Sequence, residues 1–450
     1  MTVTTNVLGT KSIPKLLFHY CIPAVIAMLI MGLQGMIDGI FVGTYISSHA
    51  LASITIALPF MQLIIGLSMI VSIGAQSYIG VLLGQGYTPK AQDCFHTFKI
   101  IIWLSAALIS LLGLTFSKEI ATLLGADETL LVYTATYIRV ISIFAIPICT
   151  LFYFGFLNRI NGKPEHYFYA SIAGIVVNIS LDYLLIAQLN LGILGAALAT
   201  GLAYTAGLLM VISPMLKKGH ILNIFVGKFS TESILTVLYN GSSEGINSLS
   251  SAVTAFLFNI SLMQIAGADG VAAFTSINYI GTLGILLLFG ISDGIGPIVS
   301  YNFGAQNTKR VKQTMGIAYL CNLLFGILIF LLLFFLGEEL ISLFIKDNPE
   351  LMALATSGAK LYALSFFVAG FNILNSGYFT FIGKGLDSVI VAASRGVIFV
   401  SLGIFILPHF LGIDGIWLSV PFAECCAGII GYLLLRKTNK EITNSASDTL

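Results

Sequence analysis

The sequence predicts an all-α polytopic membrane protein with twelve transmembrane helices. Only 9% of its 450 residues are charged and 57% are hydrophobic, whereas a soluble domain carries about 25% charged residues. The apolar residues form unbroken runs of the length that a helix needs to cross a bilayer, and none shows the alternation of a membrane β-strand. The formal net charge of +1 leaves no electrostatic footprint for a nucleic-acid partner.

The predicted helices are separated by polar and glycine-rich breaks. We expect them at residues 15–42, 51–83, 97–117, 130–157, 167–188, 192–215, 233–265, 270–302, 313–336, 353–382, 388–408 and 412–435. Several runs are longer than a bilayer requires, which predicts tilting, bending or protrusion. The cysteines lie within or beside these runs, so we expect core residues instead of disulfides or metal ligands; they are Cys21, Cys94, Cys149, Cys321, Cys425 and Cys426.

Basic residues fall almost entirely on one side of the predicted membrane. The connections on the opposite side hold only Lys118 and Lys346. Because basic residues are retained on the cytoplasmic side, this bias predicts that both termini are cytoplasmic. The N-terminal tail and the connections after the even-numbered spans carry Lys11, Lys15, Lys90, Lys99, Arg159, Lys163, Lys217, Lys218, Lys228, Lys309, Arg310, Lys312, Lys384, Arg436, Lys437 and Lys440.

The two halves of the chain repeat each other at an offset of 220 residues. Gly84 in LLGQG matches Gly304 in YNFGA, and Gly192 in LGILG matches Gly412 in LGIDG. Six spans in each half make both copies run in the same direction, related by an axis along the membrane normal. We therefore predict an N-lobe at residues 1–220 and a C-lobe at residues 221–450, two six-helix lobes related by a pseudo-two-fold axis, with a cavity between them.

The N-lobe carries two acidic residues inside predicted spans. Asp38 lies on the first span and Asp182 on the fifth, where Asn178 precedes it by one turn on the same face. Thr200 on the sixth span adds a hydroxyl. Ionisable groups at bilayer depth cost about 2.5–3.5 kcal/mol on insertion scales and so mark functional sites. These hard oxygen donors suit Na⁺, or H⁺ if the carboxylates titrate; helix packing is the alternative role for Asn178 and Thr200.

The C-lobe has apolar residues, Phe258 and Leu402, where the repeat would place two further aspartates. Its acids are Glu244, Asp293 and Glu424. We expect one or more of them to meet a cationic substrate in the cavity between the lobes, because opposite charges attract strongly where water is scarce. A position of Glu244 near the cytoplasmic surface is the alternative.

Other residues inside the spans give weaker indications. Aromatic residues such as Phe41 are candidates for an apolar cavity wall. Arg139 and Lys360 lie near the outer ends of their spans, where long basic side chains reach the interface, whereas Arg395 lies deeper and is expected to pair with a C-lobe acid. Pro23 permits a bend of the first span, either a fixed kink or one that responds to the charge of the aspartate four turns later.

Several segments together resemble the signature of the multidrug and toxic compound extrusion (MATE) family. They are NRINGKPEHYFYASIAGIVVNISLDYLLI followed by LGILGAALATGLAY, GAQSYIGVLLGQGYTPKAQ, and GIGPIVSYNFGAQN. The resemblance covers essentially the whole chain and implies two six-helix lobes. It also implies that Asp38, Asn178, Asp182 and Thr200 form a cation site in the N-lobe.

The C-lobe acids show which part of the family is most similar. The DGIGP context of Asp293 and the PFAE context of Glu424 resemble the branch that includes the MepA-type exporters. The chain departs from the NorM-type pattern, because Glu244 comes early in the seventh span and no acid follows in its middle. A C-lobe cation site is therefore not implied.

The residues and the resemblance together predict a secondary antiporter that exports lipophilic, often cationic compounds in exchange for Na⁺ or H⁺. We expect a monomer in the bacterial inner (plasma) membrane, surrounded by lipid, with small-molecule drugs or toxic organic cations as its partners and no cofactor apart from the coupling ion. A flippase for a lipid-linked precursor is the alternative, although the spans hold few basic residues for a pyrophosphate. An intramembrane enzyme is not expected, since the sequence has no HExxH metal motif. It also has no GxxxxGK[ST] nucleotide loop, so we do not expect ATP to drive the cycle directly.

Overall fold

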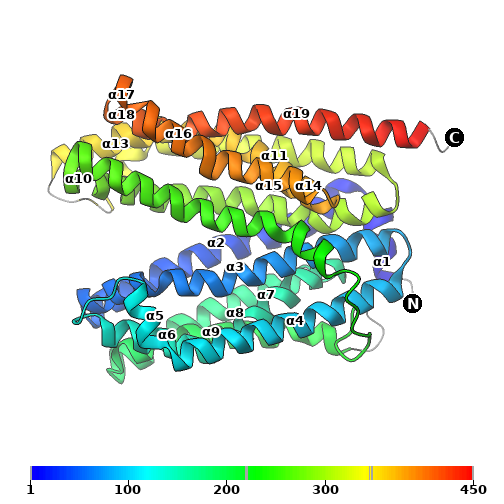
Figure 1. Ribbon diagram of the computed structural model, residues 1–450, viewed down its shortest axis with the longest axis horizontal. Helices are drawn as coiled ribbons and strands as arrows, with labels where there is room; N and C mark the ends of the chain where they lie inside the picture. Colours follow the sequence, from blue (N-terminus) through cyan, green and yellow to red (C-terminus); the bar gives the residue numbers. More distant parts are fainter. Residues whose placement is uncertain (1–2, 218–220, 344, 346–347, 448–450) are drawn as a thin grey trace.

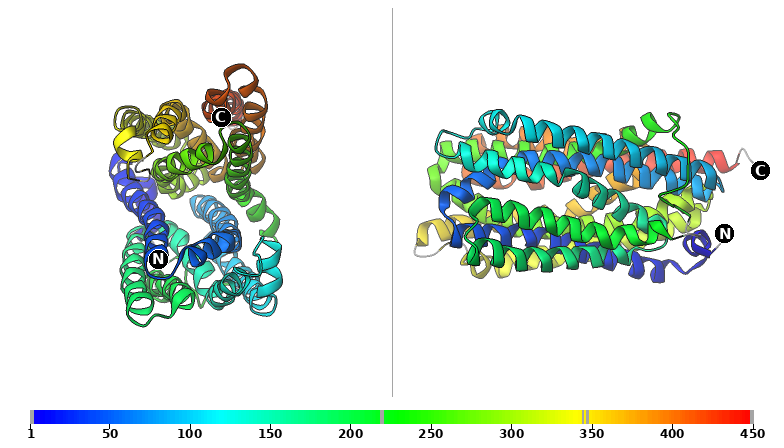
Figure 2. Two further views of the ribbon diagram at one scale, coloured as in Figure 1. Left: turned by 90° about the vertical axis from the view of Figure 1, so that its left-hand side faces the viewer. Right: turned by 90° about the horizontal axis from the view of Figure 1, so that it is seen from below.

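The computed structural model is helical, and its long helices run side by side in two bundles (Figures 1 and 2). It describes residues 3–217, 221–343, 345 and 348–447. Lys218 and Lys346, which contribute to the predicted charge bias, lie outside these residues. Figure 2 shows the bundles end on, each enclosed by helices from one half of the chain.

The N-lobe consists of α1 (Val3–Thr10), α2 (Ile13–Tyr45), α3 (Ser48–Gly84), α4 (Thr88–Thr115), α5 (Ser117–Leu123), α6 (Leu131–Ile143), α7 (Ala145–Ile160), α8 (Glu165–Leu181), η1 (Asp182–Gln188) and α9 (Gly192–Leu216). The helices α6 and α7 form one span bent by 53°. The segment η1 is a π-helix that continues α8.

The C-lobe consists of α10 (Ile234–Gly304), α11 (Thr308–Phe335), α12 (Gly337–Ile341), α13 (Pro349–Ala363), α14 (Phe366–Phe381), α15 (Gly385–Ala393), the π-helix η2 (Ser394–Ile398), α16 (Phe399–Ile406), α17 (Pro408–Leu411), α18 (Ile413–Trp417) and α19 (Ser419–Ser447). The helices α13 and α14 form one span bent by 49°.

The described residues contain the twelve predicted spans. Nine helices and two bent pairs are long and apolar enough to cross a membrane. One of the nine, α10, counts twice: its 71 residues would extend about 106 Å as one straight helix, and it turns at Gly267, which has φ 64° and ψ −151°. The observed bounds agree with the expected runs to within a few residues at most ends, and α2 continues through Pro23 without a break.

The 220-residue repeat is present in the backbone as well as in the sequence. Gly192 and Gly412 have φ values of 57° and 58°, and Gly86 and Gln306, which the offset also pairs, both have positive φ. A left-handed backbone is costly for a residue with a Cβ atom, so its recurrence at Gln306 shows that the turn geometry is repeated even where glycine is not. The fourth spans of the two lobes are both bent.

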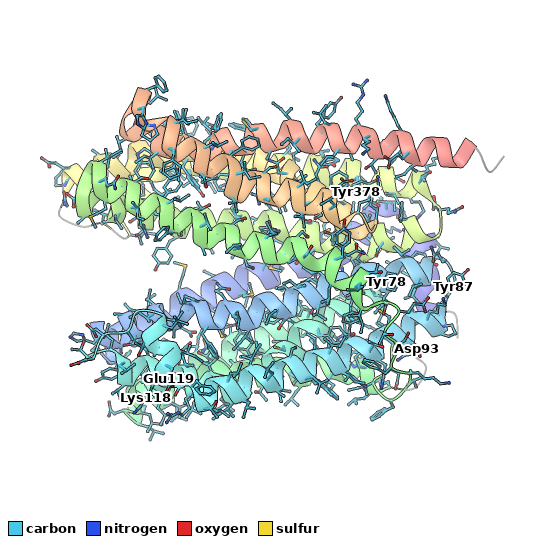
Figure 3. The ribbon with its side chains drawn as sticks, in the orientation of Figure 1. Tyr78, Tyr87, Asp93, Lys118, Glu119 and Tyr378 are labelled. Atoms are coloured by element: carbon cyan, nitrogen blue, oxygen red, sulfur yellow. The ribbon has the colours of Figure 1, made fainter. Side chains whose placement is uncertain are left out.

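The lobes touch closely through α3 and both halves of α10, and the second half shows this at the end of α3. A Cβ atom on Gly84 would lie 2.1 Å from the Tyr301 carbonyl oxygen, and one on Gly304 would lie 2.2 Å from the Val81 carbonyl oxygen. Only glycine permits this approach. Tyr87, close to Gly84 in the chain, lies at the end of the molecule that carries both termini, whereas Lys118 lies at the other end (Figure 3).

The connection between the lobes is bonded to the N-lobe up to Ser230. Gln92 Nε2 donates to the Asn223 and Val226 carbonyl oxygens at 2.8 Å each, and Gln92 Oε1 accepts from the Asn223 amide at 3.0 Å. Lys99 donates to the Ile224 carbonyl oxygen at 2.7 Å. Lys99 is therefore buried in α4 and not in a hydrated connection as expected, because its amine has a partner in the linker.

The cysteines are only partly the core residues that we expected. Cys94 and Cys149 are buried, but Cys425 is exposed and the other three are partly exposed. An apolar run that crosses a bilayer has one face against lipid, and lipid tails accept a thiol as readily as a protein core does. Position within an apolar run therefore does not separate core residues from lipid-facing ones.

Candidate functional site

The N-lobe brings its four predicted ligands together from three spans. Thr200 on α9 donates through Oγ1 to Asp38 Oδ2 on α2 at 3.5 Å. The Asp38 carboxyl group also lies next to Asn178 at the end of α8 and Asp182 at the start of η1. Asn178, Asp182 and Thr200 are buried, whereas Asp38 is partly exposed. That this cluster binds a cation stays a prediction.

A change of helix type positions the fifth span at this cluster. The α-helix α8 ends at Leu181, and the wider π-helical turn begins at Asp182. Short π-helical segments are frequent at functional sites. The corresponding span of the C-lobe also contains one, Ser394–Ile398, which carries Arg395. Each lobe thus places an ionisable residue where the helical turn widens.

Several polar atoms of the N-lobe cluster have no partner among the described residues. These buried atoms are Asp38 Oδ1, Asp182 Oδ2, and Oδ1 and Nδ2 of Asn178. A buried polar group left unpaired costs about 1–3 kcal/mol, so such groups are rare and call for an explanation. Carboxylate, amide and hydroxyl oxygens are the ligands of small hard cations. The donor set therefore fits Na⁺, and the two carboxylates fit a shared proton.

Two tyrosines beside this cluster were not identified from the sequence. The side chain of Tyr137 on α6 lies next to the Thr200 hydroxyl, and Tyr204 stands one turn after Thr200 on α9. The spacing of four residues was a usable signal for Tyr204. No local pattern could have indicated Tyr137, because α6 reaches the cluster only through the packing of the lobe.

A cavity within the N-lobe lies next to the cluster. Gln34 lines it, one turn before Asp38 on α2, and Tyr204 lines it from α9. Its other walls are mainly apolar and aromatic, with few polar groups, as is typical of small-molecule sites. The remaining lining residues are Ile30, Met31, Leu151, Phe152, Tyr167, Ala170, Ser171, Gly174 and Ala203.

A second cavity lies in the C-lobe, where it faces α3 of the N-lobe, and contains C-lobe charges. Glu244 and Asp293 of α10 and Arg395 of η2 line it, together with Ile73 of α3 from the N-lobe. Glu244 and Asp293 thus line one cavity. That these acids meet a cationic substrate stays a prediction.

Arg395 pairs with a C-lobe acid, as predicted, and the partner is Glu424. Arg395 Nη2 lies 2.6 Å from Glu424 Oε1, and Arg395 Nε donates to the same oxygen at 3.1 Å. Asn372 donates to Glu424 Oε2 at 2.6 Å. Both carboxylate oxygens of Glu424 are therefore engaged, and Glu424 is absent from the residues that line the cavity.

Phe41 does not join these residues. Its ring stacks on Tyr45 at 5.8 Å and packs against an N-lobe cluster that includes Val42 and Ile186. Phe41 lines neither cavity. The tentative substrate role of Phe41 has no support in this arrangement, because an aromatic residue of a membrane span packs against its own lobe as readily as it lines a cavity.

Arg159 is a charged residue whose position the sequence did not predict. We expected it in a cytoplasmic connection, but it lies in the last turn of α7 and its side chain is 1% exposed. Its Nη1 atom lies 3.7 Å from Asp293 Oδ2 in the other lobe. The NGKP turn that follows α7 favoured a hydrated position for Arg159. Its partner, Asp293, lies 134 residues away in the chain, so no local pattern indicates the pair.

One sequence pattern resembles a hydrolase motif without its geometry. Gly241–Gly245 reads GSSEG and so fits GxSxG, a nucleophile motif that requires a sharp strand-to-helix turn. Here the segment lies inside α10. The Ser243 hydroxyl shares a hydrogen bond of 3.1 Å with Thr380 Oγ1, and neither residue is a base. The match is one of composition alone.

Two helical lobes with polar sites inside the membrane are the architecture of many membrane transporters. A sequence model of the MatE family matches residues 23–184 and 245–405. The chain belongs to this family, which confirms the resemblance in the sequence; its members are transporters and not enzymes.

The comparisons also identify relatives over nearly the whole chain. "Multidrug export protein MepA" of Staphylococcus aureus is 25% identical over 439 residues, which are 97% of this chain and 96% of that protein. The MepA protein of Staphylococcus saprophyticus is 26% identical over 443 residues, 98% and 97% of the two chains.

Solved structures share the fold. A MATE protein in complex with MaL6 superposes with a TM-score of 0.92 at 22% identity, covering 99% of this chain and 100% of that one. An outward-facing multidrug resistance MATE transporter of the MOP superfamily gives a TM-score of 0.91 at 22% identity and covers 99% of each chain. These matches confirm the fold class with its twelve helices in two lobes.

Proposed function

We propose that this protein is a multidrug efflux antiporter that exports lipophilic, often cationic compounds in exchange for Na⁺ or H⁺. One observation carries the proposal: the N-lobe holds unpaired carboxylate and amide oxygens one helical turn from an apolar cavity. The unpaired oxygens suit a coupling ion, and the apolar cavity suits a lipophilic compound. The names of the relatives, multidrug export proteins, support small molecules as the substrates.

Shared helices supply the link between ion and substrate. Gln34 in the cavity and Asp38 in the ion cluster lie one turn apart on α2, and Tyr204 and Thr200 lie one turn apart on α9. A helix moved by a cation at Asp38 therefore also moves a cavity wall. Coupled transport requires that each ligand bind the two states of the transporter with different affinity, and the shared helices give both sites a common moving part through which such a difference can arise.

The charges of the second cavity favour cations as substrates. Glu244 and Asp293 both line it, and the basic residue that lines it, Arg395, is neutralised by Glu424. A flippase for a lipid-linked precursor would need unpaired basic groups to hold pyrophosphate. Arg395 and Arg159, the arginines at this cavity and its edge, each face an acid. The antiporter is therefore the better-supported function.

The distribution of charge supports a location in the plasma membrane with both termini in the cytoplasm. The termini lie at the same end of the molecule (Figure 1), and Asp93, near the basic loop that follows α3, lies at this end too (Figure 3). Lys118 lies at the opposite end. By the positive-inside rule the end with the termini is cytoplasmic.

Efflux from reconstituted vesicles tests this function. Vesicles loaded with a fluorescent lipophilic cation are given an inwardly directed Na⁺ gradient, an equivalent proton gradient, or neither. We expect at least one gradient to accelerate efflux, and an ionophore that collapses it to remove the acceleration. Equal rates under all three conditions, in vesicles that contain folded protein, would exclude the antiporter.

A further inference from the structure

A buried ion pair joins the two lobes at the edge of the second cavity. Arg159 belongs to α7 of the N-lobe and Asp293 to α10 of the C-lobe, and Arg159 Nη1 lies 3.7 Å from Asp293 Oδ2. The same nitrogen donates to the Asp293 backbone carbonyl at 3.3 Å. The guanidinium group also stacks on Phe156 at 4.5 Å and Tyr167 at 5.3 Å. The N-lobe itself therefore holds Arg159 in place.

The two partners differ in their access to the cavity. The side chain of Asp293 is 11% exposed and lines the cavity, whereas that of Arg159 is 1% exposed and does not. A ligand that enters between the lobes can therefore reach the carboxylate without touching the arginine. The carboxylate has two possible cationic partners, one from the N-lobe and one from the cavity.

The ion pair is also incomplete. Its distance of 3.7 Å exceeds that of a charge-assisted hydrogen bond, which is about 2.7–2.9 Å. Arg159 Nη2 is buried and has no partner among the residues described. By comparison, Arg395 and Glu424 make a close, multiply bonded pair in the same lobe. Of the two acids, Asp293 is thus the one held less tightly by its arginine. A competing cation can therefore replace Arg159 beside it.

We propose that Arg159 is a tethered cation that competes with the substrate for Asp293. When the lobes separate at the cytoplasmic end, Arg159 moves away with α7 and Asp293 binds the cationic group of a substrate. When the lobes close, Arg159 returns to Asp293 and displaces that group toward the outer side. This inference rests on the proposed function, because it assigns Asp293 to the substrate of that exporter.

Elementary electrostatics supports this exchange. A substrate cation beside Asp293 in the closed state would lie near a buried guanidinium group of the same charge, and the two would repel each other. Arg159 would also lose its acidic partner, which is strongly unfavourable for a buried charge. Both effects disfavour a bound cation in the closed state, and neither acts on an uncharged compound of similar shape.

Equilibrium binding to purified protein, without any ion gradient, tests the exchange. The probes are tetraphenylphosphonium, a lipophilic monocation, and the uncharged triphenylphosphine oxide. We expect Arg159→Gln to bind tetraphenylphosphonium about tenfold more tightly than the unchanged protein and triphenylphosphine oxide with the same affinity. Arg159→Lys, which keeps the charge, restores the original affinity. Arg139→Gln, at an exposed arginine bonded to Ser117, is the matched control and leaves both affinities unchanged.

The results separate this inference from the proposed function. Asp293→Asn is expected to weaken tetraphenylphosphonium binding about tenfold and to leave triphenylphosphine oxide unaffected. If Asp293→Asn weakens cation binding but Arg159→Gln does not strengthen it, or if Arg159→Lys behaves like Arg159→Gln, the exchange is wrong and Asp293 remains a substrate ligand. If Asp293→Asn has no effect, the inference fails as well, while efflux driven by an ion gradient still supports the antiporter.

A second measurement leaves Arg159 unchanged and so does not depend on the folding of an Arg159 variant. Ser300 on α10 is buried against Gly80 of α3, at the contact between the lobes. We expect tetraphenylphosphonium to increase maleimide labelling of Ser300→Cys at least severalfold, as mapped by mass spectrometry, because a substrate on Asp293 favours separated lobes. Triphenylphosphine oxide should leave the rate unchanged. Equal labelling with and without tetraphenylphosphonium would contradict the exchange.

Discussion

Single polar atoms define the N-lobe cluster. Most buried polar groups of a helical membrane protein find partners on the helix backbone, as Ser68 and Ser72 do with carbonyl oxygens one turn earlier. The carboxylates of Asp38 and Asp182 each retain an unpaired oxygen. Buried acids that keep an oxygen without a partner are costly for folding, so their retention indicates a function.

Replacement of either acid by its amide tests this function. We expect Asp38→Asn and Asp182→Asn each to abolish the part of efflux that an ion gradient drives, because an amide neither carries a proton nor provides a negative charge for Na⁺. Size and shape are preserved, so expression and melting temperature should change little. The measurement is vesicle efflux with and without the gradient.

An acid elsewhere on the molecule provides the control for these variants. Asp269 is exposed, just after the turn of α10 at Gly267. Asp269→Asn should retain gradient-driven efflux in full. Full gradient dependence in both Asp38→Asn and Asp182→Asn would show that these acids do not carry the coupling ion.

At the scale of helices, backbone contact between α3 and α10 closes one end of the molecule. Gly84 lies so near the Tyr301 carbonyl oxygen that a methyl group has no room. Overpacking of a tight contact costs about 1–3 kcal/mol, which corresponds to a change of about fivefold to 150-fold in an equilibrium between closed and open lobes. This contact is therefore a sensitive point for the conformational cycle.

We expect Gly84→Ala to shift the lobes toward the state that is open at this end. Maleimide labelling of Ser300→Cys should then become about tenfold faster, and efflux should slow, because the closed state is reached less often. Gly316→Ala on α11 is the control, since nothing lies within 4 Å of a Cβ atom there. Unchanged labelling in Gly84→Ala would mean that the helices can part slightly without opening the lobes.

The linker between the lobes makes a separate contribution to stability. The Gln92 side chain forms three hydrogen bonds with the linker backbone, at Asn223 and Val226. Each is worth about 1 kcal/mol. Gln92→Ala should therefore lower the free energy of unfolding by about 2–3 kcal/mol and expose residues 221–230 to protease. Melting in detergent and limited proteolysis measure both effects. The exposed Gln313→Ala on α11 should change neither.

At the scale of the whole molecule, the arrangement of the lobes predicts the topology in the membrane. Both termini and the connection after α3 lie at one end, and the connection between α5 and α6 belongs to the other. We expect a reporter that is active only outside the cytoplasm to be active when inserted after Gly125 and silent after Gly86 or at either terminus. Activity at a terminus would reverse the orientation given by the basic residues.

The sequence predicted the two lobes but not the contacts of the linker between them. The hydrophobic runs are a local signal, and they appear in the structure as spans. The 220-residue offset is a repeated signal, and it appears as paired turns such as Gly192 and Gly412. The linker after residue 220 is hydrogen-bonded to the N-lobe as far as Ser230. Those bonds come mainly from side chains on α4, which no pattern within the linker reveals.

The sequence by itself determined the fold class, the number of spans and the four oxygen donors of the N-lobe, because hydropathy, charge and helical spacing are properties of neighbouring residues. Only the tertiary structure decided which charges meet: Arg395 with Glu424 inside the C-lobe, and Arg159 with Asp293 between the lobes. The free energy of an ion pair depends on distance and burial. Both follow from the packing of whole helices and not from the order of residues along the chain.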